Sequence, residues 1–177
     1  MPRIWRIATN QTQSGFTLVE LLLYVSIASI ILLAISGLLS VLLHARIKNQ
    51  TIADVEQQGV VVMQEITQVL HNASDVDSPT IGTSASSLSV HTYTAGNNPT
   101  VLDLSSGVLR IKEGANAFVP LTNTRVTASN FTVQNLSHTG TPGTVRIQFT
   151  LDHVNPEGRN EYSYSKIFIG SATLRQP

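Results

Sequence analysis

The sequence SGFTLVELL occupies residues 14–22 and opens a long apolar run that ends at Leu43. Residues 21–43 contain no charged side chain and no proline. At about 1.5 Å per residue, a helix over this run reaches roughly 34 Å, which is enough to cross the hydrocarbon core of a bilayer. One acidic residue, Glu20, stands at the start of the run. A carboxylate inside a membrane is costly, so Glu20 is a candidate functional residue.

The residues around Gly15 resemble the class III signal of the type IV pilin superfamily, which includes pilins, minor pilins and the pseudopilins of type II secretion and competence systems. The residues that carry the resemblance are Ser14, Gly15, Phe16, Thr17, Leu18, Val19, Glu20, Leu21 and Leu22. In this family a prepilin peptidase cuts after the glycine and methylates the new amino terminus. The resemblance therefore implies cleavage between Gly15 and Phe16 and N-methylation of Phe16. The alternative is an uncleaved signal anchor that shares these residues.

The resemblance also gives Glu20 a role, because a glutamate stands at this place in the family's motif. Cleavage creates a positively charged amine at Phe16, and the amine of a neighbouring subunit can neutralise the Glu20 carboxylate. An ion pair in a low-dielectric setting is far stronger than in water, and a buried charge without its partner is strongly unfavourable. Glu20 would thus set the register of assembly. The alternative is a carboxylate that rests at the level of the lipid headgroups.

The amino-terminal segment differs from a secretory signal peptide, which has an apolar region of about 7 to 15 residues followed by its cleavage site. Here the apolar run is longer and the expected cleavage site precedes it, so cleavage leaves the helix on the mature protein. Basic residues lie on both sides of the run, with Arg3 and Arg6 before it and Arg46 and Lys48 after it. Charge therefore does not decide the orientation. The resemblance implies a single-pass protein of the bacterial inner membrane, with its amino terminus in the cytoplasm and its head outside.

The charge balance and the cysteine content exclude some classes of function. The 11 basic and 11 acidic residues cancel, and removal of Arg3 and Arg6 with the leader leaves two more acidic than basic residues. No basic excess points to nucleic acid. The chain has no cysteine, which excludes disulfides and thiolate metal sites.

The pattern after His44 changes from uniformly apolar to amphipathic. Apolar residues recur at helical spacing and define one face, at Ile52, Val55, Val62, Ile66 and Val69. This pattern predicts one helix from about Phe16 to about His71, whose second half packs on a globular head. Gly37 and Gly59 interrupt the helix, either to permit a bend or to allow close approach of a neighbour.

The remainder of the chain favours strands. Short runs of β-branched and aromatic residues are separated by Gly, Pro, Asn and Ser, which predicts strands within residues 87–94, 101–104, 108–112, 117–121, 126–136, 145–151 and 162–174. Residues 105–107 read as the turn of a hairpin. In the last run Ile167 and Ile169 show period two, which indicates one antiparallel sheet with its apolar face on the helix. Residues 75–79 are predicted to form a solvated loop that ends the helix, because a residue before proline leaves helical geometry.

The predicted fold is therefore α+β, with a long N-terminal helix packed on a C-terminal antiparallel β-rich head, a pilin-like layout. The predicted domains are a prepilin leader at residues 1–15, a transmembrane and filament-core helix at 16–43, an amphipathic helix continuing into the head at 44–72, and the β-rich head at 73–177.

The search for chemistry does not favour an enzyme. The five histidines show no spacing typical of metal ligands, and no nucleophile or phosphate-binding motif is present. Asp75 and Asp77, near Asn72 and Ser74, could offer oxygen ligands to calcium, but this loop lacks the EF-hand pattern. We therefore expect no enzymatic activity and no cofactor, and calcium binding at this loop stays open as the alternative.

The resemblance implies the function of a structural subunit of a type IV pilus or of a type II secretion pseudopilus. Residues 119–122, 131–133, 145–147 and 167–175 loosely resemble J-type minor pseudopilins and related minor pilins, which favours a minor subunit. The resemblance implies as partners the prepilin peptidase, other pilin-like subunits, and an inner-membrane assembly platform with a cytoplasmic ATPase. The alternatives are a membrane-anchored exported binding module or enzyme, and a competence pseudopilin that engages DNA.

Overall fold

The computed structural model describes residues 15–140 and 142–175. The chain divides into two compact units, of which the first ends at Leu43 and the second begins at His44. Of the predicted leader only Gly15 lies within the described residues. One helix, α1 (Leu18–His71), starts in the first unit and ends in the second. The predicted long helix is thereby confirmed.

The head part of α1, residues 44–71, buries one face. The buried residues fall at helical spacing, namely Thr51, Val55, Gly59, Val62, Ile66, Val69 and Leu70. Four of the five predicted apolar residues are in this set, whereas Ile52 is only half-buried. This buried face and the inward faces of the strands together form the core of the head.

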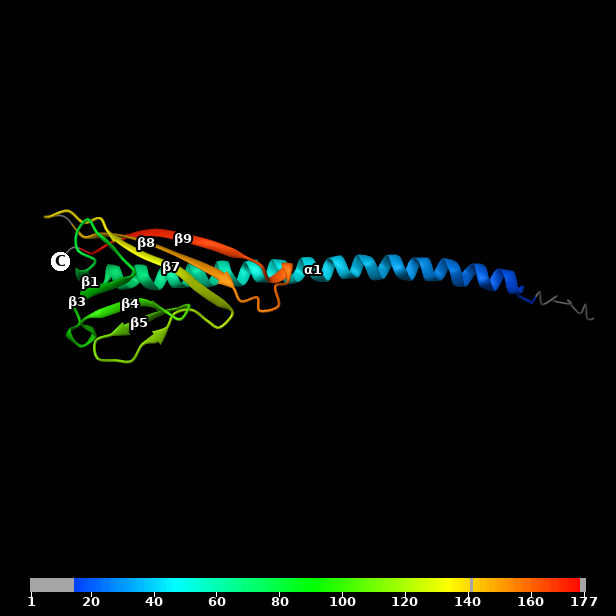
Figure 1. The fold of residues 1–177 in the computed structure, drawn as a ribbon, viewed down its shortest axis with the longest axis horizontal. Coiled ribbons are helices and arrows are strands. Elements are labelled where there is room, and N and C mark those ends of the chain that lie inside the picture. The colour runs from blue at the N-terminus through cyan, green and yellow to red at the C-terminus, as the bar shows by residue number, and fades with distance from the viewer. Residues whose placement is uncertain (1–14, 141, 176–177) are drawn as a thin grey trace, which may run out of the picture. The chain divides into compact units, whose positions relative to one another are not determined.

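The strands form two antiparallel sheets (Figure 1). The five-stranded sheet has the order β1 (Ala73–Ser78), β3 (Ser87–Thr92), β4 (Thr100–Ser105), β5 (Val108–Glu113) and β6 (Val119–Pro120). The four-stranded sheet has the order β2 (Ser84–Ala85), β7 (Val126–Asn135), β8 (Thr144–His153) and β9 (Ser165–Thr173). The α+β class is confirmed, but the expectation of a single sheet is wrong. Periodicity shows which faces are apolar and does not specify which strands pair.

The predicted hairpin turn between β4 and β5 is confirmed, and a backbone hydrogen bond links it to the other sheet. β4 and β5 pair up to Ser105 and Val108, and the two residues between them, Ser106 and Gly107, have φ of 50° and 77°. Positive φ at both central residues is the requirement of the tight turn that suits the twist of a hairpin. The Gly107 carbonyl accepts a 2.7 Å hydrogen bond from the N–H of Ala128 in β7.

The segment after the helix is not the predicted loop. Residues 73–78 form strand β1, which pairs with β3 through Val76 and Val90 and is broken by two irregularities of register. Pairing with a neighbouring strand overrides the low strand propensity of Asp and Ser. The irregularities at this sheet edge leave Asp75 and Asp77 exposed.

The prediction of which face of β9 (Ser165–Thr173) packs on the helix is wrong. Ile167 and Ile169 are each 57% exposed, whereas Phe168 and Ala172 between and beyond them are buried. Phe168 reaches the helix because Gly59 leaves room, since a Cβ at Gly59 would lie 2.0 Å from the Phe168 ring. Gly59 thus allows close approach, with a strand as its neighbour.

Candidate processing and assembly site

The peptide bond predicted to be cleaved lies outside the helix and is exposed. Gly15 and Phe16 precede the first helical residue, Leu18, and the side chain of Phe16 is 71% exposed. A Cβ built on Gly15 would meet no atom within 4 Å. The folded chain therefore does not require glycine at this position, and a requirement for it has to come from outside the chain.

The helix start is fixed by Thr17. The Thr17 hydroxyl accepts a 3.3 Å hydrogen bond from the Glu20 N–H, and the Thr17 carbonyl accepts one of 3.1 Å from the Leu21 N–H. Threonine before a helix with glutamate three residues later is the pattern of a capping box. Thr17 is thus a positioning residue that the sequence analysis missed, although the Thr-x-x-Glu spacing could have shown it.

The Glu20 carboxylate is held by its own helix. Its Oε1 accepts a long hydrogen bond of 3.4 Å from the Tyr24 hydroxyl, one turn further on. The Tyr24 ring in turn meets the Phe16 ring edge-on, with 5.8 Å between centroids. Phe16, Glu20 and Tyr24 therefore form one cluster at the amino-terminal end of α1. Within the part of the chain that the structure describes, Glu20 forms no ion pair.

The stretch of α1 from Leu18 to Leu43, which we call the rod, leaves its apolar side chains uncovered. Large apolar residues of this stretch are between 49% and 75% exposed, and no residue of it is buried. By length and composition α1 is able to cross a membrane. Ser29 donates to the Val25 carbonyl at 2.7 Å, and Ser26 donates to the Leu22 carbonyl. These hydroxyls are satisfied inside the helix by the carbonyls one turn earlier.

The head part of α1 is tied to the β8–β9 connection by charged side chains. Lys48 Nζ donates to the carbonyls of Ser163 at 2.6 Å and Asn160 at 3.2 Å, around the short 3₁₀ helix η2 (Asn160–Tyr162). His44 Nε2 lies 3.3 Å from Glu161 Oε1. A hydrogen bond from its own backbone, with Arg159 donating as well, holds the pKa of Glu161 below its ordinary value.

A second tie joins α1 to the start of β9. Glu56 Oε1 accepts from Lys166 Nζ at 2.6 Å and from the Tyr164 hydroxyl at 3.1 Å. These two donors lower the pKa of Glu56, and the same contact raises the pKa of Lys166. Glu56 is more than one hundred positions away in sequence from both Tyr164 and Lys166. No pattern in the sequence could have brought them together.

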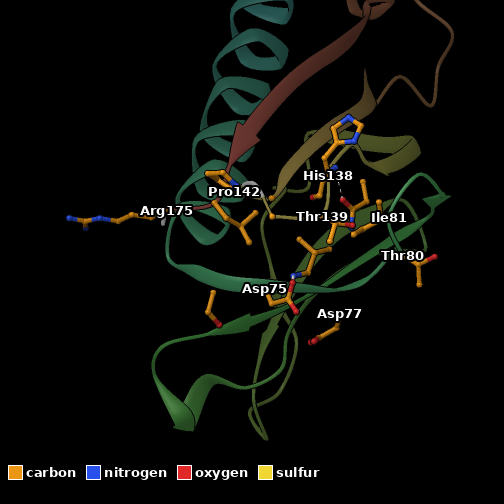
Figure 2. Close-up of a pocket in the computed structure, with 15 residues that line it drawn as sticks. Asp75, Asp77, Thr80, Ile81, His138, Thr139, Pro142 and Arg175 are labelled. Carbon is orange, nitrogen blue, oxygen red and sulfur yellow. Dashed lines mark hydrogen bonds between the residues drawn. The ribbon is translucent and has the colours of Figure 1, made fainter. Parts of the chain in front are cut away.

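The aspartates of the calcium alternative lie at a cavity of about 710 Å³. Figure 2 shows Asp75 and Asp77 on one side of it and His138, from the β7–β8 connection, on the other. Asp75 Oδ1 accepts the N–H of Val76 at 2.8 Å. Asp77 instead accepts from the Ser89 hydroxyl at 3.3 Å and lies 3.8 Å from His91 Nδ1. The two carboxylates therefore take separate partners.

Elsewhere in the described part of the chain, histidines and carboxylates meet in pairs, as His44 and Glu161 do. No three His, Asp or Glu side chains come together to hold a metal ion among residues 15–140 and 142–175. Calcium binding and the expected lack of a cofactor both stay predictions. The sequence site residues Gly15, Phe16 and Glu20 lie within six positions of one another at the start of α1, and their cleavage, methylation and pairing stay predictions as well.

One comparison with known protein families gives a match over the start of α1. Residues 10–36 match the model of the prokaryotic N-terminal methylation motif. The match supports a type IV pilin-like protein that is processed by a prepilin peptidase, and the apolar helix within it is consistent with membrane anchoring. No curated protein and no solved structure matches the chain.

Proposed function

We propose that the chain is a structural subunit, of the kind found as minor pilins or J-type minor pseudopilins, that assembles through its N-terminal helix into a type IV pilus or a type II secretion pseudopilus. One observation carries the proposal: an exposed Gly15–Phe16 bond stands directly before a helix whose only early acid, Glu20, forms no ion pair among the described residues.

The Gly15–Phe16 bond is accessible to a peptidase, and the helix after it does not depend on the leader. The bond is accessible because it precedes the capped helix, and the helix needs nothing before Thr17 to start. Removal of the leader leaves Phe16 as the amino terminus, four positions before Glu20 and directly before the capping residue Thr17. The new amine then lies close to the rod's end, where it is available to a neighbouring subunit.

Pairing of that amine with Glu20 of a neighbour supplies the register. The rod exposes apolar side chains on all faces, so packing of rods buries them without fixing how far one slides past another. A single acid and a single amine remove this freedom, because only one offset leaves both charges paired. Tyr24 keeps the carboxylate oriented before the partner arrives.

The role is non-enzymatic, and the peptidase acts on the chain as a substrate. Before assembly the rod lies in the bacterial inner membrane with the head outside, and the assembly platform and its cytoplasmic ATPase move it into the filament. The head, with a net charge near zero and no metal-binding group among its described side chains, offers contact surface to other pilin-like subunits.

Mass spectrometry of the membrane-extracted protein tests the proposal. We expect a mature chain that begins at a methylated Phe16, and Glu20→Ala is expected to be cleaved normally yet lost from the filament. Glu20→Asp, which keeps the charge, is the matched control. An intact Met1 on the wild-type chain would instead indicate a tethered binding module or enzyme. Retention of the head on DNA at physiological salt would favour a competence pseudopilin.

A further inference from the structure

An apolar groove of about 460 Å³ runs between α1 and β9 in the head. Its strand wall is Phe168 and Ile169, and its helix wall is the set Val60, Met63, Gln64, Thr67, Gln68 and His71. Val60 is 49% exposed and Ile169 is 57% exposed, so the apolar lining is open to solvent. Figure 1 shows β9 running along the head part of α1.

The groove is built into the fold. Two glycines let β9 lie against the helix, since a Cβ at Gly59 would meet the Phe168 ring at 2.0 Å and a Cβ at Gly170 would meet Met63 Sδ at 2.7 Å. The Glu56–Lys166 ion pair fixes the start of β9 on the same helix. A wall held in this way does not have to be ordered when a partner binds.

The helix wall has the shape of a helix-packing surface. Its six residues form two rows of four-residue spacing, Val60–Gln64–Gln68 and Met63–Thr67–His71. Rows of this spacing are ridges, and the groove between two such ridges accepts a ridge of another helix. A helix is therefore the occupant that the surface fits.

The lack of fixed charge in the groove indicates what kind of helix it can bind. Its polar lining consists of two amides and one hydroxyl, and its one titratable lining residue is His71, at the end of the helix. A surface without fixed charge suits a partner without charge, because a charged side chain would lose its hydration there and gain no partner. The rod is such a helix, since residues 21–43 carry no charge.

We propose that this groove receives the apolar rod of a neighbouring subunit that carries the same methylation motif, so that β9 and α1 of one head cover part of another subunit's rod. The proposal rests on the proposed function, because only an assembling subunit brings a rod to the head of another. It accounts for Ile169, which the fold leaves exposed beside the groove on an edge strand.

Charge substitutions in the full-length chain test the groove. Val60→Arg and Ile169→Arg place a cation in the contact and are expected to lower incorporation into the filament by about tenfold or more. Both side chains are exposed, so the head is expected to unfold at the wild-type temperature. Val119→Arg is the matched control, because Val119 in β6 is 56% exposed and lies outside the groove.

A crosslink identifies the occupant. The chain has no cysteine, so Gln64→Cys carries its only thiol, to which a benzophenone maleimide is attached. In isolated filaments we expect a crosslinked peptide from within the apolar N-terminal helix of a motif-bearing subunit. A peptide from a head, a lipid adduct or no protein adduct overturns the proposal.

The two levels of failure are distinguishable. A wild-type chain that is not cleaved before Phe16, or that enters no filament, contradicts the proposed function itself. A wild-type chain that is cleaved and assembled, together with Val60→Arg and Ile169→Arg variants that assemble equally well, overturns the groove alone.

Discussion

The two parts of α1 are continuous in sequence and backbone, yet they follow opposite rules of burial. In the rod, large apolar side chains are at least 49% exposed and charges are absent beyond Glu20. In the head part, apolar side chains such as Val62 and Leu70 are fully buried. Three charged residues there reach the rest of the head: Lys48, Glu56 and Asp54, which lies 3.2 Å from Arg125.

This difference shows that helical structure and tertiary stability are separate in α1. The head part is stabilised by its packing in the core and by polar contacts with the rest of the head, and its amphipathic pattern reflects that packing. The rod is a helix without a core, and its uniformly apolar pattern is consistent with membrane anchoring. Substitutions of the same kind in the two parts are therefore expected to have different consequences for the stability of the head.

The largest expected effect comes from two leucines. Leu70 is completely buried and Leu33 is 74% exposed. Leu70→Ala removes core volume and is expected to lower the free energy of unfolding by about 2–5 kcal/mol. Leu33→Ala leaves no cavity and is expected to change it by less than about 0.5 kcal/mol. Calorimetry of the full-length chain in detergent measures both, and equal losses would show that the rod contributes to the stability of the head.

The second-largest expected effect on the stability of the head comes from a comparison of two glycines in α1. Gly59→Ala drives a methyl group into the Phe168 ring and is expected to destabilise the head by about 1–3 kcal/mol, despite the better helix propensity of alanine. At Gly37 a Cβ meets nothing within 4 Å, so Gly37→Ala is expected to leave the head unchanged and to raise the helicity of the rod. Calorimetry and circular dichroism separate the two effects. A stable Gly59→Ala head would mean that β9 can move off the helix at little cost.

The sequence was sufficient to predict the rod, but it was not sufficient to predict how the strands of the head pack. A charge-free run and one acid identify the rod and its candidate site, because these are local properties. The face of β9 was not predictable, since Ile167 and Ile169 alternate with Phe168, and only the position of Gly59 on the helix decides which side faces inward. Strand β1 was missed because its pairing with β3 outweighs its composition.

The polar ties could not be predicted for a different reason. Lys48 binds backbone carbonyls of residues 160 and 163, and a carbonyl has no signature in a sequence. Glu56 finds Tyr164 and Lys166 only through the fold. At the helix start, by contrast, the link from Thr17 to Glu20 spans three positions, and the Thr-x-x-Glu spacing could have shown it although the sequence analysis missed it.

The smallest expected effect is a dependence on pH that belongs to the head part alone. Lys166 and Tyr164 hold the pKa of Glu56 below its ordinary value of 4.5. A depressed pKa stabilises the fold above the ordinary value, and this contribution is lost as the pH falls from 4.5 through the lower folded value. We expect the melting temperature of the wild-type head to fall more steeply in this range than that of Glu56→Gln.

The controls for this prediction lie in both parts of α1 and in the head. The pKa of Glu161 is also lowered, and Glu161 remains in both proteins, so the difference between their curves reports Glu56. Glu20→Gln, the same substitution in the rod, is expected to follow the wild-type curve, because no residue of the rod is buried. A Glu56→Gln curve parallel to that of the wild type would show that the contact with Lys166 adds nothing to the stability of the head, as exposed ion pairs often do not.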